Sequence, residues 1–388
     1  MFIDILNELQ DTFNALSDYC ILWKMKVNVD KTKIIMFSKR KCKNYPEFIL
    51  NGEKIELVDS YVYLGTTIKF NGKFQEAKKK QLLQAKRALA AIISQKEKLQ
   101  LPLDIFFNLF DTMVLPILLY NCEVWGYEDF EILEIFYRAF LKNTLKLNKQ
   151  TPNCMVYGES GRYPLHITIK LRMVNFWTRI VTGDENKLVF HIYKLLRQMH
   201  VNENYTSPWI GKVEDIFNNC GMRNIWLNPL NFNPLWIKKS LNLRLNDIFS
   251  QQWHSNIMDM NSCITYKLFK NEIKFEKYLM NLDITERINL CKFRCRNSKI
   301  PSVVRGYAYL NIPYENRVCT FCNLNEIGDE YHYVMRCHYF QNSREKYIEN
   351  VFWINPSYNK FSKLFQSKDV GVLRNLAKFI KNINRKFT

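Results

Sequence analysis

The 388-residue chain contains few glycines and prolines, 12 and 11 respectively. Because these two residues dominate turns, their scarcity indicates long regular elements joined by short loops. Long apolar runs are also missing: the longest stretch without a charged residue is 224–237, and it contains Pro229 and Pro234. A membrane-crossing helix needs about 20 consecutive apolar residues, so this stretch cannot be a membrane span.

Sequence patterns of several enzyme classes are missing as well. The chain has no glycine-rich phosphate loop, no His-Glu-x-x-His pair and no Gly-x-Ser-x-Gly turn. Its first residues include Asp4, Glu8 and Asp11, the opposite of the basic start and apolar core of a signal peptide. With no secretory signal and an odd number of cysteines, 11, we expect reduced thiols in a cytoplasmic or nuclear protein that is not secreted.

Basic residues outnumber acidic residues in the chain. Lys and Arg number 56 against 37 Asp and Glu, which gives a formal net charge of +19. Such a surface attracts polyanions, so we expect RNA, DNA or an RNA–DNA hybrid as the partner, ahead of an anionic membrane or a merely solvated basic surface. The hydrophobic content of 47% excludes a mostly disordered chain. Composition leaves the oligomeric state open.

A set of potential metal ligands lies near the C-terminus. Cys319, Cys322, His332 and Cys337 form a C-x2-C-x9-H-x4-C pattern. Three thiolates and one imidazole complete the tetrahedral ligand set of Zn²⁺, and the two-residue gap lets one turn present both thiolates to the same ion. We therefore predict a structural zinc site, the alternative being four reduced residues. His338 could replace Cys337 as the fourth ligand.

Hydrophobic periodicity predicts an α+β fold that is mostly α. Residues 2–20 have the spacing of a helix with one buried face, and 23–28 alternate as a strand does. Two short apolar runs flank Asn51-Gly52, the strongest local hairpin signal, and a further strand is expected over 61–68. From residue 75 to about 300 the patterns are helical, and two short helices are expected over 342–352 and 369–385.

Several segments resemble the reverse transcriptases of non-LTR (LINE-type) retrotransposons. Residues 19–33 contain the Asn28-x-x-Lys31-Thr32 pattern and resemble the segment that follows the catalytic aspartates of that family. Tyr63-Leu64-Gly65 looks like the hairpin that grips the primer end. Residues 75–126, with Leu115 to Tyr120 and Val124-Trp125-Gly126, resemble its helical thumb, and 157–165 and the terminal Cys/His set are similar to the region after the thumb.

This resemblance implies an order of domains. It divides the chain into a palm remnant with a small antiparallel sheet (1–73), thumb helices (74–150), a helical connection domain (151–300), a CCHC-type zinc-binding module (301–345) and a basic helical tail (346–388). The parent activity would be RNA-directed DNA polymerisation. The sequence leaves open whether the gene is complete upstream of Met1; an in-frame Tyr-x-Asp-Asp turn there would make the chain a piece of a polymerase.

Catalysis by this family needs carboxylates that hold two Mg²⁺ ions. The sequence contains no Asp-Asp pair, and the nearest pattern, 127–130, has acids that fit the start of the following helix better. We therefore expect neither Mg²⁺ binding nor catalysis. Lys31 matches the family lysine thought to protonate the leaving pyrophosphate, and is at most a vestigial general acid; a solvated lysine is the alternative.

Charge and resemblance together give the candidate nucleic-acid contacts. They are the loop residues Lys39, Arg40, Lys41 and Lys43, the hairpin residues Tyr63, Leu64 and Gly65, and the helix residues Lys78, Lys79, Lys80, Lys86 and Arg87. The expected function is that of an inactive polymerase fragment that binds RNA or an RNA–DNA hybrid. A host-adopted zinc-containing nucleic-acid-binding protein is the alternative, and a translated pseudogene without function is the third.

Overall fold

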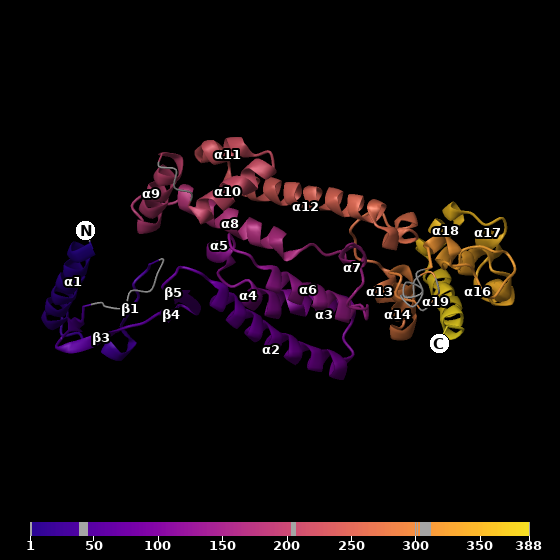
Figure 1. Cartoon of the computed structure of the whole chain (residues 1–388), viewed down its shortest axis with the longest axis horizontal. Helices are drawn as coiled ribbons and strands as arrows, with labels where there is room; N and C mark the ends of the chain where they lie inside the picture. The colour runs from indigo at the N-terminus through magenta and orange to yellow at the C-terminus, as the bar shows by residue number, and fades with distance from the viewer. Residues whose placement is uncertain are drawn as a thin grey trace. The chain divides into compact units, whose positions relative to one another are not determined.

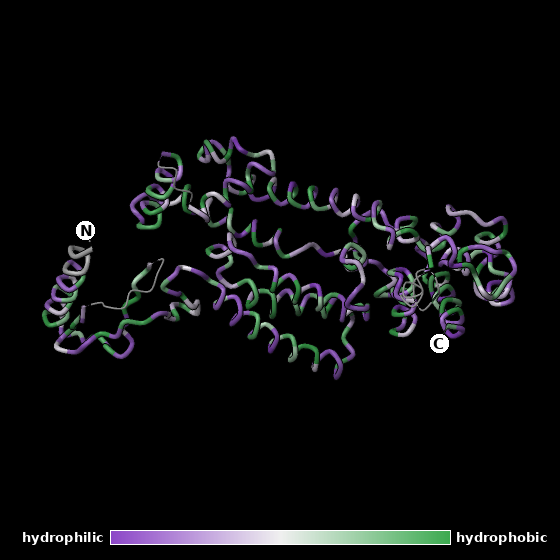
Figure 2. The backbone as a smooth tube through the Cα atoms, in the orientation of Figure 1, coloured by the Kyte–Doolittle hydropathy of each residue, from purple (hydrophilic) through white to green (hydrophobic). Residues whose placement is uncertain are grey.

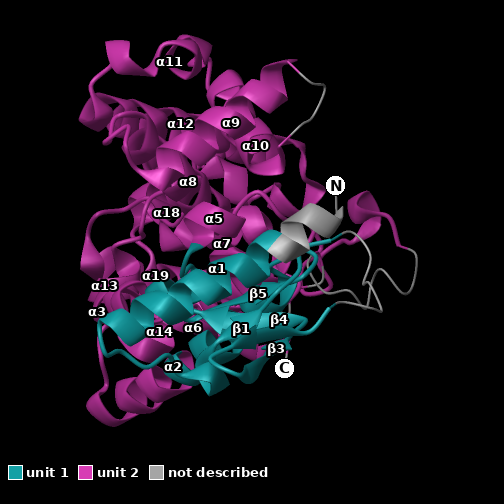
Figure 3. Ribbon diagram, turned by 90° about the vertical axis from the view of Figure 1, so that its left-hand side faces the viewer, with its two compact units in different colours: residues 1–88, 115–121 teal, residues 89–114, 122–388 magenta. Residues whose placement is uncertain are grey.

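The computed structural model describes residues 2–38, 46–202, 207–298, 300, 302 and 312–387. With 65% helix and 6% strand it confirms the prediction of a mostly helical α+β fold. The chain divides into two compact units, coloured separately in Figure 3: unit 1 comprises 1–88 and 115–121, and unit 2 comprises 89–114 and 122–388. The division into five segments stays a prediction.

Unit 1 contains one long helix and two small sheets. The three-stranded sheet has the order β1-β3-β2, with β1 parallel and β2 antiparallel to β3, and β4 and β5 form a separate hairpin. The elements of unit 1 are α1 (Phe2–Leu22), β1 (Lys33–Ile34), β2 (Phe48–Leu50), β3 (Glu53–Leu57), β4 (Ser60–Tyr63), β5 (Thr66–Lys69) and α4 (Leu115–Leu118). Helix α2 (Gln75–Leu99) begins in unit 1 and ends in unit 2.

The β2–β3 hairpin turns where the sequence predicts it. Asn51 and Gly52 have φ of 54° and 79°, the left-handed values that a two-residue turn of this kind needs. Phe48 lies opposite Ile55, and both side chains enter the core of the sheet. The apolar face of α1 covers this core through Leu9 and Phe13, which confirms the predicted N-terminal helix.

Two strand predictions in unit 1 are wrong. Residues 23–28 form no strand, because Lys24 has a φ of 53° and ends α1 in a left-handed turn. Residues 61–68 form a hairpin instead of one strand: Leu64 and Gly65 have φ of 45° and 81° and reverse the chain between β4 and β5. Alternation of apolar residues cannot reveal such turns when the turn itself carries a leucine.

Unit 2 is built from helices joined by short connections. Helices α8 and α12 lie side by side, as Figure 1 shows. The helices are α3 (Leu103–Leu109), α5 (Cys122–Trp125), α6 (Glu131–Thr144), α7 (Asn153–Ser160), α8 (Leu165–Val181), α9 (Leu188–Asn202), α10 (Pro208–Asn219), α11 (Arg223–Leu227), α12 (Pro234–Asp259), α13 (Tyr278–Asn281), α14 (Ile284–Arg294), α16 (Gln341–Tyr347), α17 (Asn350–Trp353), α18 (Tyr358–Phe365) and α19 (Val370–Arg385).

The helices alternate short apolar and polar stretches along their length, as Figure 2 shows. Trp125, Trp177 and Trp253 are fully buried between them. Across the described ranges, no helix combines the length and the apolar character needed to cross a membrane.

The end of the chain follows the prediction in part. Helix α19 matches the predicted 369–385, and the Asp369 carboxylate caps it by accepting bonds from the amides of Gly371 and Val372. The predicted helix over 342–352 is broken at Ile348 and becomes α16 and α17. Helix α18 was not predicted.

A fully buried ion pair joins α7 to α14. Arg294 donates through Nε and Nη2 to the Glu159 carboxylate at 3.0–3.2 Å, and the Tyr278 hydroxyl donates to the same carboxylate. The third guanidinium nitrogen donates to the carbonyl of Phe365 at 2.9 Å. The Glu159 side chain is 0% exposed and that of Arg294 1% exposed, so the pair is a packing element within unit 2.

The residues after Glu159 also serve the fold. Gly161 ends α7 with a φ of 63°, and a β-carbon there would lie 2.1 Å from the backbone nitrogen of Phe275. Arg162 makes two bonds to the carboxylate of Asp111, at 2.6 and 2.8 Å, and stacks on the ring of Phe107. The 157–165 segment thus fixes α7 against α14, against the backbone at Phe275 and against Asp111.

Candidate metal centre and nucleic-acid interface

Cys319 and Cys322 lie on a tight loop between two short extended segments. Val318 pairs with Ile327 in an isolated antiparallel bridge, and the Cys319 amide donates to the carbonyl of Glu326 at 2.8 Å. Gly328 follows this bridge. A larger residue there would crowd Tyr333, because a β-carbon would lie 2.5 Å from the Tyr333 hydroxyl. The bridge therefore fixes both thiols at one end of the loop.

His332 and Cys337 come from the opposite side, at the two ends of a π-helical turn (His332–Arg336). The Asp329 carboxylate accepts from the His332 amide at 2.8 Å, and the Cys337 amide donates to the carbonyl of His332 at 2.8 Å. The buried guanidinium of Arg344 donates to three backbone carbonyls of the same turn, those of Tyr333, Val334 and Cys337. These bonds hold the turn in a conformation that presents both ligand side chains to the loop.

The four ligand atoms have the spacing of a tetrahedral metal site. All lie within 4.8 Å of one another, with 3.9 Å between the sulfurs of Cys319 and Cys337 and 3.4 Å from the Cys322 sulfur to His332 Nε2. Zn–S bonds of about 2.3 Å and Zn–N bonds of about 2.0 Å require edges of about 3.8 Å and about 3.5 Å in a tetrahedron. The Cys₃His cluster could therefore hold a metal ion, and its dimensions are compatible with zinc.

The electrostatics of the cluster favour a thiolate at Cys319. A hydrogen bond from Cys337 lowers the pKa of Cys319 to about 3, although burial alone would raise it. A hydrogen bond from His332 lowers this pKa further. The same hydrogen bond and burial raise the pKa of Cys337. Burial opposes a charged imidazole, yet hydrogen bonds to Cys319 and Glu326 raise the pKa of His332. A cation in the centre would replace the proton that these groups share.

Glu326 orients the imidazole. Its carboxylate lies 3.0 Å from His332 Nδ1, which leaves Nε2 directed at Cys322, and it also pairs with Arg336 at 2.8 Å. A carboxylate behind a ligating histidine is a common second shell of zinc sites. His338 is exposed and lies outside the group, whereas Cys337 is 0% exposed within it, so Cys337 and not His338 completes the Cys₃His cluster.

The basic helix α2 presents four of its five predicted contacts. Lys79, Lys80, Lys86 and Arg87 are exposed. Lys78 is only 3% exposed, which removes it from the candidate contacts. The reason is its place on the helix: Lys78 precedes the buried Leu82 and Ala85 by four and seven residues and so continues their buried stripe.

The predicted Tyr63-Leu64-Gly65 contact forms the exposed tip of the β4–β5 hairpin. Tyr63 and Leu64 are 58% and 72% exposed. The tip is supported from behind, because the hydroxyl of Tyr120 donates to the Leu64 carbonyl at 2.8 Å and the amide of Asn121 donates to Thr66 Oγ1 at 2.6 Å. Segment 115–121, distant in sequence, thus buttresses this hairpin within unit 1.

Lys31 lies in a one-turn 3₁₀ helix (Val29–Lys31) and its side chain is exposed. The Asn28 side chain accepts from the Lys31 amide at 3.0 Å, and the Thr32 hydroxyl donates to the Asn28 carbonyl at 2.9 Å. The Asn-x-x-Lys-Thr pattern is therefore a capped turn. The other predicted contacts, Lys39, Arg40, Lys41 and Lys43, lie outside the described residues.

Two groups that support the metal centre were not predicted from the sequence, Glu326 and Arg344. Neither stands at a diagnostic spacing from the ligands, although a carboxylate between two ligand pairs is a signal that could have been weighed for Glu326. Searches of protein-family models, of curated proteins and of solved structures found no match to this chain.

Proposed function

We propose that this protein binds RNA, DNA or an RNA–DNA hybrid through the exposed cations of α2, as a polymerase-related chain that lacks the polymerising carboxylates. The observation that carries the proposal is the exposed basic face formed by Lys79, Lys80, Lys86 and Arg87 in a chain of net charge +19. The resemblance of 19–33, 61–68 and 75–126 to non-LTR reverse transcriptases supports it, since α2 corresponds there to a thumb helix.

The spacing of these cations suits contact with a phosphate backbone. Lys79 and Lys86, like Lys80 and Arg87, are seven residues apart, which on a helix is about 10.5 Å along nearly the same side. Two parallel rows of cations can neutralise several phosphates of one strand without reading bases. Binding of this kind tolerates any sequence and weakens steeply with salt, because each neutralised phosphate releases condensed counterions.

The Cys₃His cluster is proposed as a structural zinc site. All four ligands belong to the protein, which leaves no open position for a substrate. The metal would fix the short bridge at Val318 and the π-helical turn to each other. Residues Cys319, Cys322, His332 and Cys337 would hold it, with Glu326 as the partner of the imidazole.

The test is the salt dependence of binding to a duplex DNA of arbitrary sequence. In the Lys79→Glu/Lys80→Glu/Arg87→Glu variant we expect the slope of log K against log salt to flatten by up to about 2.7, the sum for three lost phosphate contacts. The matched control is Lys238→Glu/Lys239→Glu/Arg244→Glu on α12, which changes the net charge equally at three exposed positions. An unchanged slope in the α2 variant, or equal flattening in the control, contradicts an interface on α2.

A further inference from the structure

The charge-free stretch 224–237 forms a turn between two helices of unit 2. Helix α11 ends at Leu227, a 3₁₀ helix follows (Pro229–Asn231), and α12 begins at Pro234. Four large apolar side chains of this turn are 49–73% exposed: Leu227, Leu230, Leu235 and Trp236. We call these four side chains the apolar corner.

The apolar corner has a defined conformation. The Asn233 side chain caps α12 by accepting from the amides of Leu235 and Trp236 at 2.8 and 3.3 Å. The ring of Trp236 stacks on that of Phe232, with 5.7 Å between centroids and 18° between planes. Three neighbours in the sequence are buried: Ile225, Trp226 and Ile237. These buried residues anchor the turn, whereas the corner itself faces water.

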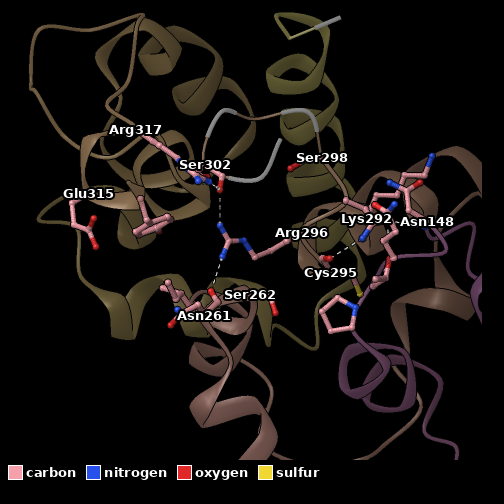
Figure 4. Close-up of a pocket in the computed structure, with 16 residues that line it drawn as sticks. Asn148, Asn261, Ser262, Lys292, Cys295, Arg296, Ser298, Ser302, Glu315 and Arg317 are labelled. Atoms are coloured by element: carbon pink, nitrogen blue, oxygen red, sulfur yellow. Dashed lines mark hydrogen bonds between the residues drawn. The ribbon is translucent and has the colours of Figure 1, made fainter. Parts of the chain in front are cut away.

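The apolar corner is an outer surface of unit 2. Helix α11, which ends at the corner, lies at the upper edge of unit 2 in Figure 1 and in Figure 3. A cavity of about 1000 Å³ in unit 2 is lined by the 148–152 loop, the 261–264 turn, the end of α14 and the 314–317 segment (Figure 4). None of the residues that line this cavity belongs to the corner. An outer surface of this kind suits an extended partner.

The charge around the corner has one sign. Residues 216–246 contain no Asp and no Glu. The four cations of this range are all exposed: Arg223, Lys238, Lys239 and Arg244. Arg223 precedes the corner in the sequence, and the two lysines follow it directly, so cations flank the exposed apolar side chains at both ends. A partner complementary to this surface must be apolar in its middle and anionic around it.

An anionic lipid bilayer has this chemistry. Leucine side chains bury their apolar surface at the boundary between headgroups and acyl chains, and tryptophan rings prefer the level of the headgroups. Lysine and arginine beside them are attracted to the negative surface of the membrane. A nucleic acid would satisfy the cations but presents mainly phosphates to three exposed leucines. A second copy of the chain would bring like charges together, which is unfavourable.

We propose that the apolar corner binds the surface of an anionic phospholipid bilayer. The three leucines and Trp236 enter the interface, and Arg223, Lys238 and Lys239 contact the phosphates of the headgroups. The chain lies on the bilayer and does not cross it, because 224–237 is short and contains two prolines. This surface is separate in the sequence from the cations of α2.

The experiment is sedimentation of the full-length protein with lipid vesicles in the absence of nucleic acid. The protein should sediment with vesicles of phosphatidylcholine and phosphatidylserine, and much less with phosphatidylcholine alone. Leu230→Asp/Leu235→Asp should weaken binding by more than about tenfold, because two leucines no longer leave water. The matched control is Leu188→Asp/Leu195→Asp on α9, where the leucines are 73% and 57% exposed and the change in charge is the same.

A second pair of variants separates the corner from attraction by net charge. Lys238→Glu/Lys239→Glu should weaken binding to the anionic vesicles by at least about 25-fold, about fivefold for each cation. Lys79→Glu/Lys80→Glu/Arg87→Glu reverses more charges but leaves the corner intact, so it should weaken vesicle binding less. The leucine variant should bind duplex DNA as the wild type does, which keeps this test independent of the interface on α2.

Four results overturn the proposal. They are no binding to either kind of vesicle, unchanged binding in Leu230→Asp/Leu235→Asp, equal loss in the α9 control, and greater loss in the α2 variant than in the lysine variant. Sedimentation velocity without lipid tests the second copy: a dimer that the leucine variant converts to monomer assigns the corner to self-association instead. Thermal unfolding of each variant at the midpoint of the wild type shows that a loss of binding is not a loss of folding.

Discussion

Substitution of Arg294 should destabilise unit 2 more than any exposed substitution. In Arg294→Met the shape of the side chain is largely kept, but the Glu159 carboxylate, 0% exposed, loses the cation that donates to both of its oxygens. Removal of one partner from a buried ion pair costs about 3–5 kcal/mol, since the other charge stays buried without compensation. The Phe365 carbonyl also loses its donor, which adds about 1–3 kcal/mol.

Such a loss approaches the whole stability of many domains, about 5–15 kcal/mol. We therefore expect the unfolding midpoint of Arg294→Met in urea to fall sharply, measured by tryptophan fluorescence, which reports on the buried Trp177 and Trp253 of unit 2. The double variant Arg294→Met/Glu159→Leu, which removes both charges, should recover most of the loss.

The matched control is Lys274→Met. Lys274 pairs with Glu272 at 3.6 Å, and both side chains are 66% exposed, so the substitution should change stability by less than about 0.5 kcal/mol. If Arg294→Met is no more destabilising than this control, or if the double variant is as unstable as the single one, the ion pair does not join α7 to α14 as described.

The same network predicts a pH dependence. Burial raises the pKa of Glu276, but attraction to Arg294 and Lys270 outweighs it and holds the pKa below its ordinary value. A carboxyl of this kind contributes stability above its unfolded pKa of about 4.3, and that stability is lost as the pH falls through the folded value. The loss of stability below about pH 4.3 should be shallower in Arg294→Met, because the cation that lowers the pKa of Glu276 most is gone.

Three further outcomes are expected. Gly161→Ala should destabilise by more than about 2 kcal/mol, because a left-handed φ and a backbone clash combine there, whereas Gly221→Ala, with a similar φ and open space, should cost about 1 kcal/mol in the same urea titration. Metal analysis without chelator should give one Zn²⁺ per chain, lost in Cys322→Ser and kept in Cys291→Ser and His338→Ala; a wild-type content well below one refutes the site. Primer extension with Mg²⁺ or Mn²⁺ should not exceed a heat-killed control, and template-dependent incorporation would refute the inference from the missing carboxylates.

Local sequence signals were sufficient for part of the fold and of the metal cluster. Asn51-Gly52 predicts its hairpin because the turn conformation depends on those two residues alone. The Cys and His spacing predicts the cluster because a short loop and a single helical turn bring the ligands together. In each case the interacting residues lie within about 20 positions of one another, so periodicity and spacing are sufficient to predict the local structure.

Features that depend on distant contacts could not be predicted. Glu159 and Arg294 are 135 residues apart, and nothing in either local pattern marks them as partners. The failed strand over 23–28 shows the converse: an alternating pattern gives no strand where the backbone turns at Lys24 with a φ of 53°.

The residues that carry the resemblance to reverse transcriptases are largely used to build the fold. Asn28 and Thr32 close a turn, Gly65 allows the hairpin to reverse, and Glu159 and Gly161 fix α7 against its neighbours. Residues of this kind affect stability, while activity depends on the groups that face solvent or a ligand. For this chain the proposed groups are the cations of α2 and the Cys₃His cluster. Substitutions in the first set and in the Cys₃His cluster should therefore lower stability, whereas substitutions of the α2 cations should change binding at unchanged stability.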